Sequence, residues 1–547
     1  KATGRNSEAV NANQTAVALS PQDGEAHNNL GIILKELGRL DEAEASYTQA
    51  IALKPGYAEA HSNLGSALKE LGRLDEAEAS YTQAIALKPD HAQAHYNLGN
   101  TLQELGRLDE ALASYTQAIA LKPDYGEAHN NLGIILKELG RLDEAELSYK
   151  RVIALNPFHA KAHSNLGNIL YKLGRLDDAK ASYKQAISLK SDYAEAHSNL
   201  GGTFKELGRL EDAEVSFRQV ISLKPDYAEA HTNLGVTLKE MGRLDEAEAS
   251  HGQAITLKPD FAEAYSNLGN TLKELGRLEE AVASYTQAIA LKPDFLEAHN
   301  NLGYALQEQG RLEEAEASYS QAIVLKPDYA EAHYNLGNTL KELGRLEGAE
   351  ASYNQAIALK PDYAEAHNNL GITLETLEKL DEAEASYTQA IVLKPDFAGA
   401  LRNRWLLLFN RKEFEAALRD ADLGISKGVR ELDLTTLYAL GRIEEIYKRI
   451  EMRSEVDGEN ISIAAFAAFI AEAEKKSTAY NFCSNPIDFI HFANLSSHVN
   501  DSVTYVAGLI EELNKIETIW EPSGKSTVSG LQSRNGMNLF KSPSGKI

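Results

Sequence analysis

A segment of 34 residues recurs along most of this chain, and its fixed period limits the fold more than any other feature of the sequence. The stretch HNNLGIILKELGRLDEAEASY, which begins at His27, returns ten more times in close copies. With Gly24 as position 1, a Leu-Gly pair falls at positions 7 and 8 of every unit, from Leu30 onward, and eleven units cover residues 24–397. Such a period predicts a linear array of similar structural units.

Each unit carries the signals of two short helices. In P-D-Y-A-E-A the Asp and the Glu three residues later form a capping pair, which predicts that first helices start after Asp226 and Asp328. Gly38 in ELGRLDEA is suited to the left-handed residue that ends a helix, and a second helix begins at LDEAEASY. Two short helices cannot bury both of their apolar faces alone, so we expect each hairpin to stack on the next.

The pattern resembles the tetratricopeptide repeat, with Leu-Gly at positions 7 and 8, Ala at 20, an aromatic at 24 and Pro at 32. His251 replaces the aromatic in one unit, and Ser191 replaces the proline in another. The resemblance implies an all-α fold: a right-handed superhelical α-solenoid of helix-turn-helix repeats, followed by a small, partly irregular C-terminal segment. It also implies a role in protein–protein interaction.

The repeat phase divides the chain into four parts. Residues 1–23 fit the second helix of a truncated repeat, and residues 24–397 are the eleven repeats. Residues 398–454 keep the phase in degenerate form, including an A-L-G-R corner near Gly441, and we expect them to cap the solenoid. Residues 455–547 lack the period and read as the incomplete start of another domain.

Position 6 is asparagine in every repeat, although packing does not demand this and neighbouring positions 5 and 9 vary. We expect this position to face the inner wall formed by the first helices. An asparagine can bond both the C=O and the N–H of an extended peptide without reading its side chains. The predicted peptide-binding residues are Asn29, Asn63, Asn97, Asn131, Asn165, Asn199, Asn233, Asn267, Asn301, Asn335 and Asn369.

This column is similar to the asparagine ladder in the repeats of the protein O-GlcNAc transferases, which grips peptide main chain along the superhelix. The similarity implies an interaction scaffold that binds extended segments in its groove. Two alternatives stay open for the column itself. The asparagines can bridge adjacent repeats, or duplication can have copied them without a binding role.

Charge and composition restrict the partners. The chain has a formal net charge of −25, which disfavours nucleic acid and anionic membranes. Its longest late apolar run, ISIAAFAAFIA, is too short to span a bilayer. The single cysteine, Cys483, fits a reducing compartment, so we expect a cytoplasmic protein whose partner is a protein or peptide. The oligomeric state and the identity of the peptide are not readable.

Other constellations do not predict a catalytic or metal site. Ten histidines occupy position 4, but separate hairpins hold them, so we expect hydrogen-bonded histidines at helix interfaces rather than metal ligands. Glu-rich strips such as DEAEAS are read as solvated outer faces. Gly524-Lys525-Ser526-Thr527 has the tail of a phosphate loop, but Ile519 stands where its first glycine belongs.

The C-terminal segment has a resemblance of its own. NFCSNPIDFIHFANL and IWEPSGKSTVSGLQSRNGMNLF resemble the stretch before the catalytic barrel in repeat-bearing 2-oxoglutarate and iron(II) dependent oxygenases. Those enzymes bind iron with H-x-D/E and a distal His. His491 and His498 have no such context, so the chain as given carries no catalytic constellation and no cofactor. Iron and 2-oxoglutarate enter only if a catalytic domain follows Ile547.

Three rival functions therefore accompany the groove-binding scaffold. The chain can be the substrate-recruiting part of such an oxygenase, or the repeat part of a glycosyltransferase. It can also be an assembly scaffold that uses its acidic outer face, and its binding would then weaken with salt.

Overall fold

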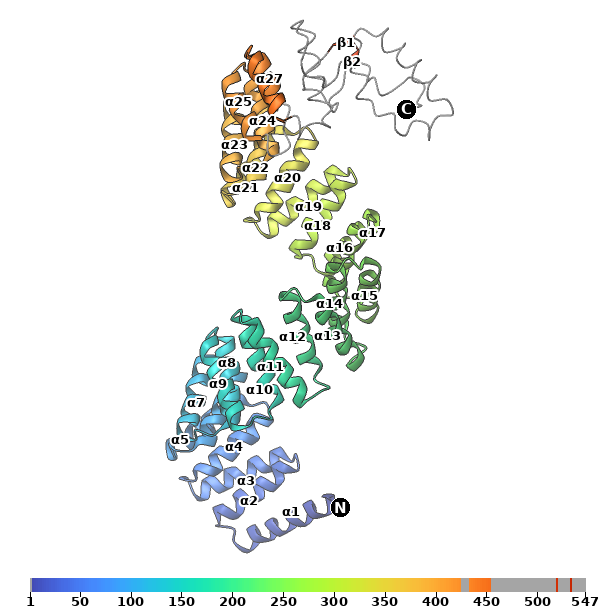
Figure 1. Ribbon diagram of the computed structural model, residues 1–547. Coiled ribbons are helices and arrows are strands. Elements are labelled where there is room, and N and C mark those ends of the chain that lie inside the picture. The colour runs from blue at the N-terminus through green and yellow to red at the C-terminus, as the bar shows by residue number, and fades with distance from the viewer. Residues whose placement is uncertain (1, 425–431, 454–517, 520–531, 534–547) are drawn as a thin grey trace, which may run out of the picture. The chain divides into compact units, whose positions relative to one another are not determined.

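In the computed structural model the repeats are stacked helix hairpins, which confirms the predicted all-α solenoid (Figure 1). The structure describes residues 2–424, 432–453, 518–519 and 532–533. The chain divides into two compact units, Lys1–Leu291 and Lys292–Ile547.

The first unit begins with one helix and continues with eight hairpins, each of a 13-residue first helix and a 14-residue second helix. Its helices are α1 (Ala2–Leu19), α2 (Gly24–Glu36), α3 (Leu40–Leu53), α4 (Ala58–Glu70), α5 (Leu74–Leu87), α6 (Ala92–Glu104), α7 (Leu108–Leu121), α8 (Gly126–Glu138), α9 (Leu142–Leu155), α10 (Ala160–Lys172), α11 (Leu176–Leu189), α12 (Ala194–Glu206), α13 (Leu210–Leu223), α14 (Ala228–Glu240), α15 (Leu244–Leu257), α16 (Ala262–Glu274) and α17 (Leu278–Leu291).

The described residues of the second unit form three more hairpins of this kind, four shorter or atypical helices, and a two-stranded antiparallel pair. Its elements are α18 (Leu296–Glu308), α19 (Leu312–Leu325), α20 (Ala330–Glu342), α21 (Leu346–Leu359), α22 (Ala364–Thr376), α23 (Leu380–Leu393), α24 (Ala398–Asn410), α25 (Phe414–Gly424), α26 (Leu432–Ala439), α27 (Ile443–Arg453), β1 (Thr518–Ile519) and β2 (Gln532–Ser533).

Glycine makes the corner inside most hairpins. Gly38 has φ +72°, and its equivalents in the next nine repeats are also left-handed, as the sequence predicts. Gly441 has φ 70° and forms the predicted corner between α26 and α27. The eleventh repeat differs, because Glu378 takes this conformation at φ 62°. Its corner therefore carries a side chain in a backbone region that L-residues avoid.

Replacing Glu378 with glycine should stabilise the protein by about 0.5 to 1 kcal/mol. The left-handed conformation costs an L-residue about 1 to 2 kcal/mol, and the greater freedom of glycine in the unfolded chain offsets part of the gain. The midpoint of thermal unfolding should rise. Glu382→Gly, the same change inside α23, is the control and should lower the midpoint, since glycine in a helix costs about 1 kcal/mol. An unchanged midpoint for Glu378→Gly would contradict strain at this corner.

The turn before the first helices corrects the capping prediction. Tyr227, not Asp226, is the N-cap residue of α14, and it makes no side-chain cap hydrogen bond. The N–H of Tyr227 donates to the C=O of Lys224 at 3.2 Å. This closes a β-turn with proline at its second position, which suits the fixed φ of proline. The same holds at Asp328, where Tyr329 is the N-cap residue of α20. The aspartate thus lies within the turn.

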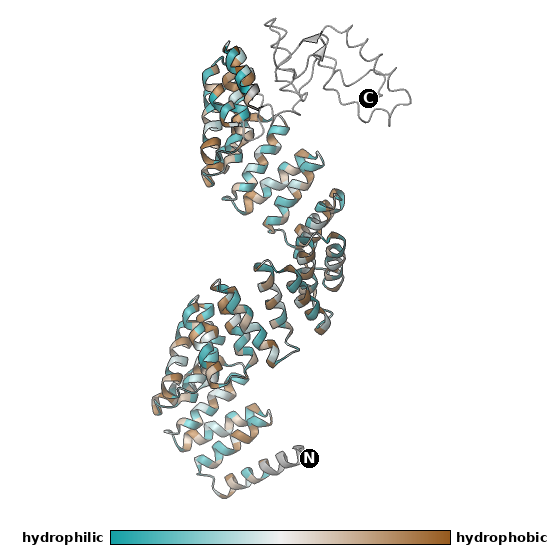
Figure 2. Cartoon of the chain, viewed as in Figure 1, coloured by the Kyte–Doolittle hydropathy of each residue, from teal (hydrophilic) through white to brown (hydrophobic). Residues whose placement is uncertain are grey.

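The core of each hairpin is a contact between the glycine at position 8 and the ring at position 24. A Cβ added to Gly167 would lie 2.6 Å from a ring carbon of Tyr183, and one added to Gly371 would lie 2.5 Å from Tyr387. Both rings are buried, which confirms position 24 as core. Each helix carries brown hydrophobic and teal hydrophilic residues together, as an element with one packed side requires (Figure 2).

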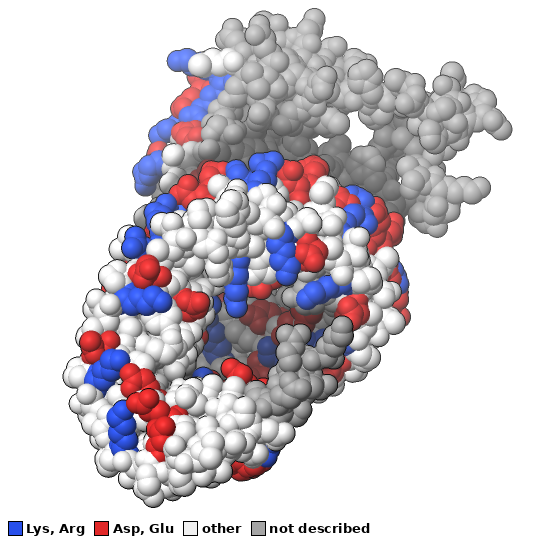
Figure 3. Space-filling view, turned by 90° about the horizontal axis from the view of Figure 1, so that it is seen from below, with Lys and Arg blue, Asp and Glu red and all other residues white. Residues whose placement is uncertain are grey.

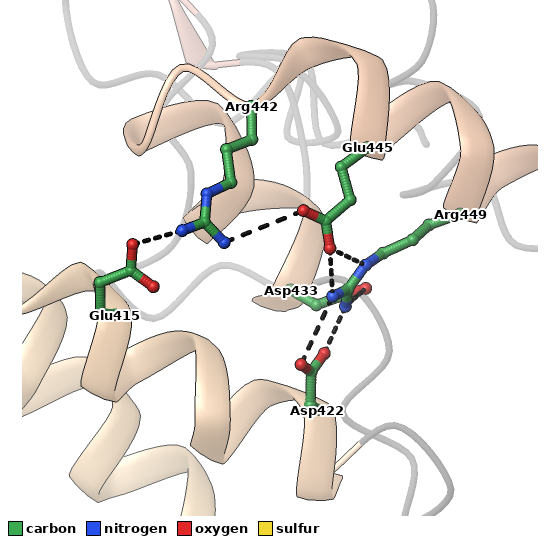
Figure 4. Close-up of polar contacts among 6 residues, drawn as sticks. All are labelled: Glu415, Asp422, Asp433, Arg442, Glu445 and Arg449. Atoms are coloured by element: carbon green, nitrogen blue, oxygen red, sulfur yellow. Dashed lines mark hydrogen bonds and ion pairs between the residues drawn. The ribbon is translucent and has the colours of Figure 1, made fainter.

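Charged pairs join the last described helices of the second unit (Figure 4). Arg449 on α27 contacts Asp422 on α25, lies 3.0 Å from the buried Asp433 on α26, and lies 2.7 Å from Glu445 on its own helix. Ile446 packs on buried leucines of α25 and α26. One guanidinium therefore links three helices around an apolar contact.

Candidate functional site

The position-6 asparagines lie on the first helices, and solvent reaches all eleven. Asn29 and Asn233 are exposed, and the other nine are half-buried. Consecutive first helices contact one another, for example α10 with α12 and α12 with α14. Within each unit they therefore form a continuous face that carries the column.

Some column members bond to the preceding repeat. The Nδ2 of Asn199 donates to Oδ1 of Asn168 at 2.9 Å. Asn63 donates to Asn28 at 3.0 Å, and Asn335 donates to Asn300 at 3.2 Å. Each of these asparagines thus donates one N–H to the neighbouring hairpin. Within the described chain no hydrogen bond uses their Oδ1 atoms, which keep their acceptor capacity.

Two members are bonded at both ends of the amide. Asn131 Nδ2 donates to Asn100 Oδ1 at 2.9 Å and to the Tyr96 hydroxyl at 3.3 Å, while its Oδ1 accepts from Asn130 at 3.2 Å. Asn369 repeats this arrangement in the second unit. In these two repeats the seam-bridging alternative describes the column better than peptide binding does.

Most of the remaining members form fewer hydrogen bonds through their side chains, or none. Asn29, Asn165, Asn233 and Asn267 make no side-chain hydrogen bond within the described chain. Asn97 Oδ1 accepts from Gln93 at 3.0 Å. Asn301, on α18, is engaged and does not belong to the uncommitted set.

The residues at positions 5 and 9 of the preceding repeat separate the two groups. Asn199 follows a repeat with Asn168 at position 9, whereas Asn233 follows Ser198 and Gly202. Asn267 likewise follows a repeat with Thr and Val at these positions. The position-6 amide thus donates a hydrogen bond where position 5 or 9 of the preceding repeat offers an amide or phenol oxygen. Where small or apolar residues stand at both positions, the amide forms no such bond. Asn165, which follows Asn130, is the exception.

The asparagine at position 9 has a structural role that the sequence prediction missed: it accepts hydrogen bonds from two side chains. Asn168 Oδ1 accepts from the Tyr183 hydroxyl at 2.7 Å as well as from the column amide. Asn100 and Asn338 do the same, and Asn270 also accepts from the buried tyrosine of its own hairpin. The available signal was that asparagine at position 9 always accompanies tyrosine at position 24.

A hollow of about 480 Å³ opens on this face in the first unit. Most of its wall comes from the first helices α8, α10, α12 and α14, and it includes the column residues Asn199 and Asn233. Basic residues from the ends of α8, α10 and α12 also line it: Lys137, Lys172 and Lys205. The hollow therefore combines amide groups with positive charge.

The position-4 histidines form the predicted interface hydrogen bonds. In ten repeats Nε2 lies 3.0 to 3.4 Å from the carbonyl oxygen six residues earlier, for example His197 with Ser191. Burial lowers the pKa of His61, His129 and His367. Among the described residues no group of three His, Cys, Asp or Glu is arranged to hold a metal ion.

Acidic and basic side chains lie next to one another over much of the face seen in Figure 3. Arg73, for example, bonds Glu76 in its own repeat and Glu44 in the preceding one. No described helix is long and apolar enough to cross a membrane.

Four features singled out in the sequence lie outside the described residues: the Gly524–Thr527 segment, Cys483, His491 and His498.

Several solved structures are similar to parts of this chain. MamA is 26% identical with a TM-score of 0.28, and the match covers 30% of this chain and 97% of that one. YrrB, described as a TPR protein with an unusual peptide-binding site, is 23% identical with a TM-score of 0.29 and coverages of 34% and 95%. The Cut9–Hcn1 hetero-tetramer of the APC/C is 14% identical with a TM-score of 0.37, and the match covers 80% of this chain and 94% of that one. No curated protein matches the chain.

Family models match through most of the repeats. The model of the cilia and flagella-associated protein 70 C-terminal domain matches residues 56–264 and, in an overlapping second match, residues 127–333. Three tetratricopeptide repeat models match residues 33–72 and 337–377, residues 364–397, and residues 12–45 and 318–351. With its stacked hairpins and constant period, this chain belongs to the tetratricopeptide repeat proteins.

Proposed function

We propose that the first helices of the N-terminal unit bind an extended segment of another protein and hold its main chain with position-6 amides. The chain is a repeat scaffold of a kind typical of protein–protein interaction. The uncommitted state of Asn233 and Asn267 is the observation that carries the finer proposal. Each offers a donor and an acceptor on a face that solvent reaches.

The spacing suits an extended guest. Neighbouring first helices lie roughly one helix diameter apart, about 10 Å, and an extended chain advances about 3.3 to 3.6 Å per residue. Roughly every third residue of the bound segment therefore lies beside one column amide. Asn199, which keeps its Oδ1 acceptor, is next in line before Asn233 and Asn267. Three consecutive repeats can therefore hold one stretch of main chain.

The experiment is hydrogen–deuterium exchange of the full chain with and without a labelled peptide of about 12 residues, long enough in extended form to pass four repeats. The peptide contains serine, threonine and alanine only, so that its main chain dominates. We expect slower exchange in α12, α14 and α16. Slower exchange confined to α13 and α15 would favour the outer face instead, and no change with saturating peptide would reject groove binding.

A further inference from the structure

A ladder of ion pairs links the last turns of several consecutive first helices. The lysine at position 12 of one repeat bonds the glutamate at position 13 of the next. Within the first unit the closest pairs are Lys35–Glu70 at 3.1 Å, Lys69–Glu104 at 2.8 Å and Lys239–Glu274 at 2.8 Å. Position 12 and position 13 thus neutralise one another across each of these seams.

The ladder is interrupted in the middle of the first unit. Gln103 and Tyr171 stand in place of lysine at position 12 of the third and fifth repeats, and between the fourth and fifth repeats it is the glutamate that is missing. Position 13 of the fifth repeat is Lys172, so Lys137 faces a like charge where a glutamate is expected. Neither lysine makes an ion pair within the described chain. The next lysine of the column, Lys205, reaches Glu240 only at 3.4 Å, the longest pair of the ladder in this unit.

These lysines converge on the hollow. Lys137, Lys172 and Lys205 all line it, whereas the glutamates beside them in sequence, Glu138 and Glu206, do not. Glu195 also lines the hollow, but it stands in the first turn of α12 and Lys205 in the last. Ten residues of helix separate the two, about 15 Å at 1.5 Å per residue. The basic end of the hollow is therefore distinct from its acidic end.

We propose that this basic end binds an acidic side chain of the docked segment, with its carboxylate between Lys137 and Lys172. The site rests on the proposed groove binding and adds a preference for segments that carry glutamate or aspartate. Charge complementarity supports this occupant, because two unpaired ammonium groups at one seam repel each other until an anion lies between them. The remaining acidic surface would otherwise disfavour such a partner.

The test compares three labelled peptides of serine, threonine and alanine that differ only in a central pair: Glu-Glu, Gln-Gln or Lys-Lys. The Glu-Glu peptide should bind the full chain about tenfold more tightly than the Gln-Gln peptide, and the Lys-Lys peptide more weakly than both. Added salt should reduce the preference for Glu-Glu.

Lys172→Glu restores the residue that most repeats have at position 13, and it lets Lys137 form the missing pair. This variant should remain folded, lose the preference for Glu-Glu and bind Gln-Gln as before. Lys69→Gln, in the same column but outside the hollow, is the control and should keep the preference.

The outcomes separate the two proposals. Equal binding of Glu-Glu and Gln-Gln to the wild-type chain would overturn the acidic-residue site and leave groove binding intact. A preference that survives Lys172→Glu would also overturn it. Failure of all three peptides to bind would reject the groove and the site together.

Discussion

Replacing His251 with phenylalanine is expected to stabilise the protein by about 2 to 4 kcal/mol at neutral pH. His251 occupies the ring position of the seventh repeat with none of its surface exposed, and neither ring nitrogen has a hydrogen-bond partner. A buried polar group without a partner costs about 1 to 3 kcal/mol. Phe217 fills the same position one repeat earlier, against Gly201, so the backbone accommodates this ring.

The effect should grow in acid. Burial lowers the pKa of His251 to about 4, and the charge of Lys239 contributes. A histidine in the unfolded chain has a pKa of about 6.5. Because the folded pKa is the lower one, the unfolded chain takes up more protons as the pH falls from about 6.5 to about 4, and stability drops by about 1.4 kcal/mol per pH unit. The free energy of unfolding falls by about 3 kcal/mol in total over this range, and His251→Phe should not show this fall.

Hydrogen exchange of the amides in α14 and α15 measures this change locally, which suits an array whose stability is a sum over repeats. His251→Tyr is the matched control. Its hydroxyl would face a repeat with Val236 at position 9, where other repeats offer an asparagine. We expect it to stabilise less than His251→Phe. Faster exchange in His251→Phe than in wild type at neutral pH would contradict this account of the buried ring.

Changing Asn233 and Asn267 together to alanine should weaken binding of the serine, threonine and alanine peptide by about 2 to 4 kcal/mol. Each hydrogen bond contributes about 0.5 to 1.5 kcal/mol, and each amide can make two. The dissociation constant should rise by at least about 30-fold, as fluorescence anisotropy would show. Stability should change little, since neither side chain forms a hydrogen bond within the described part of the chain.

Asn131→Ala is the control for this pair. It removes the same amide from the same column, but that amide is already bonded to Asn100, Tyr96 and Asn130. We expect it to lower stability by about 1 kcal/mol or more and to leave affinity nearly unchanged. Equal losses of affinity in Asn131→Ala and in the double variant would contradict the claim that only the unbonded amides of the column bind peptide.

The repeat architecture was predictable because each hairpin depends on local signals that the sequence repeats. Gly38 and its equivalents mark the corner, and the ring at position 24 marks the core. The capping prediction was wrong because it considered Asp226 and the glutamate three residues later without the proline before them. The preceding proline closes a β-turn through Tyr227, and that turn places the aspartate before the helix.

The column was predictable as a surface feature but not in its bonding. Its members are identical in sequence, so nothing at position 6 distinguishes Asn131 from Asn233. The difference arises one repeat earlier, at positions that vary, and depends on whether an oxygen such as that of Asn100 lies within reach. The broken ion-pair ladder at Lys172 was hidden for the same reason, because it is a relation between repeats.

The most direct test of groove binding is to titrate wild type, Asn131→Ala and the Asn233→Ala, Asn267→Ala double variant with one peptide in two forms. One form is ordinary, and the other is methylated on alternate main-chain nitrogens. We predict tight binding of the ordinary peptide to wild type and Asn131→Ala, and weak binding in every combination that lacks either the two amides or the main-chain N–H groups. Equal affinity for the methylated peptide, or for the double variant, would contradict main-chain recognition by this column.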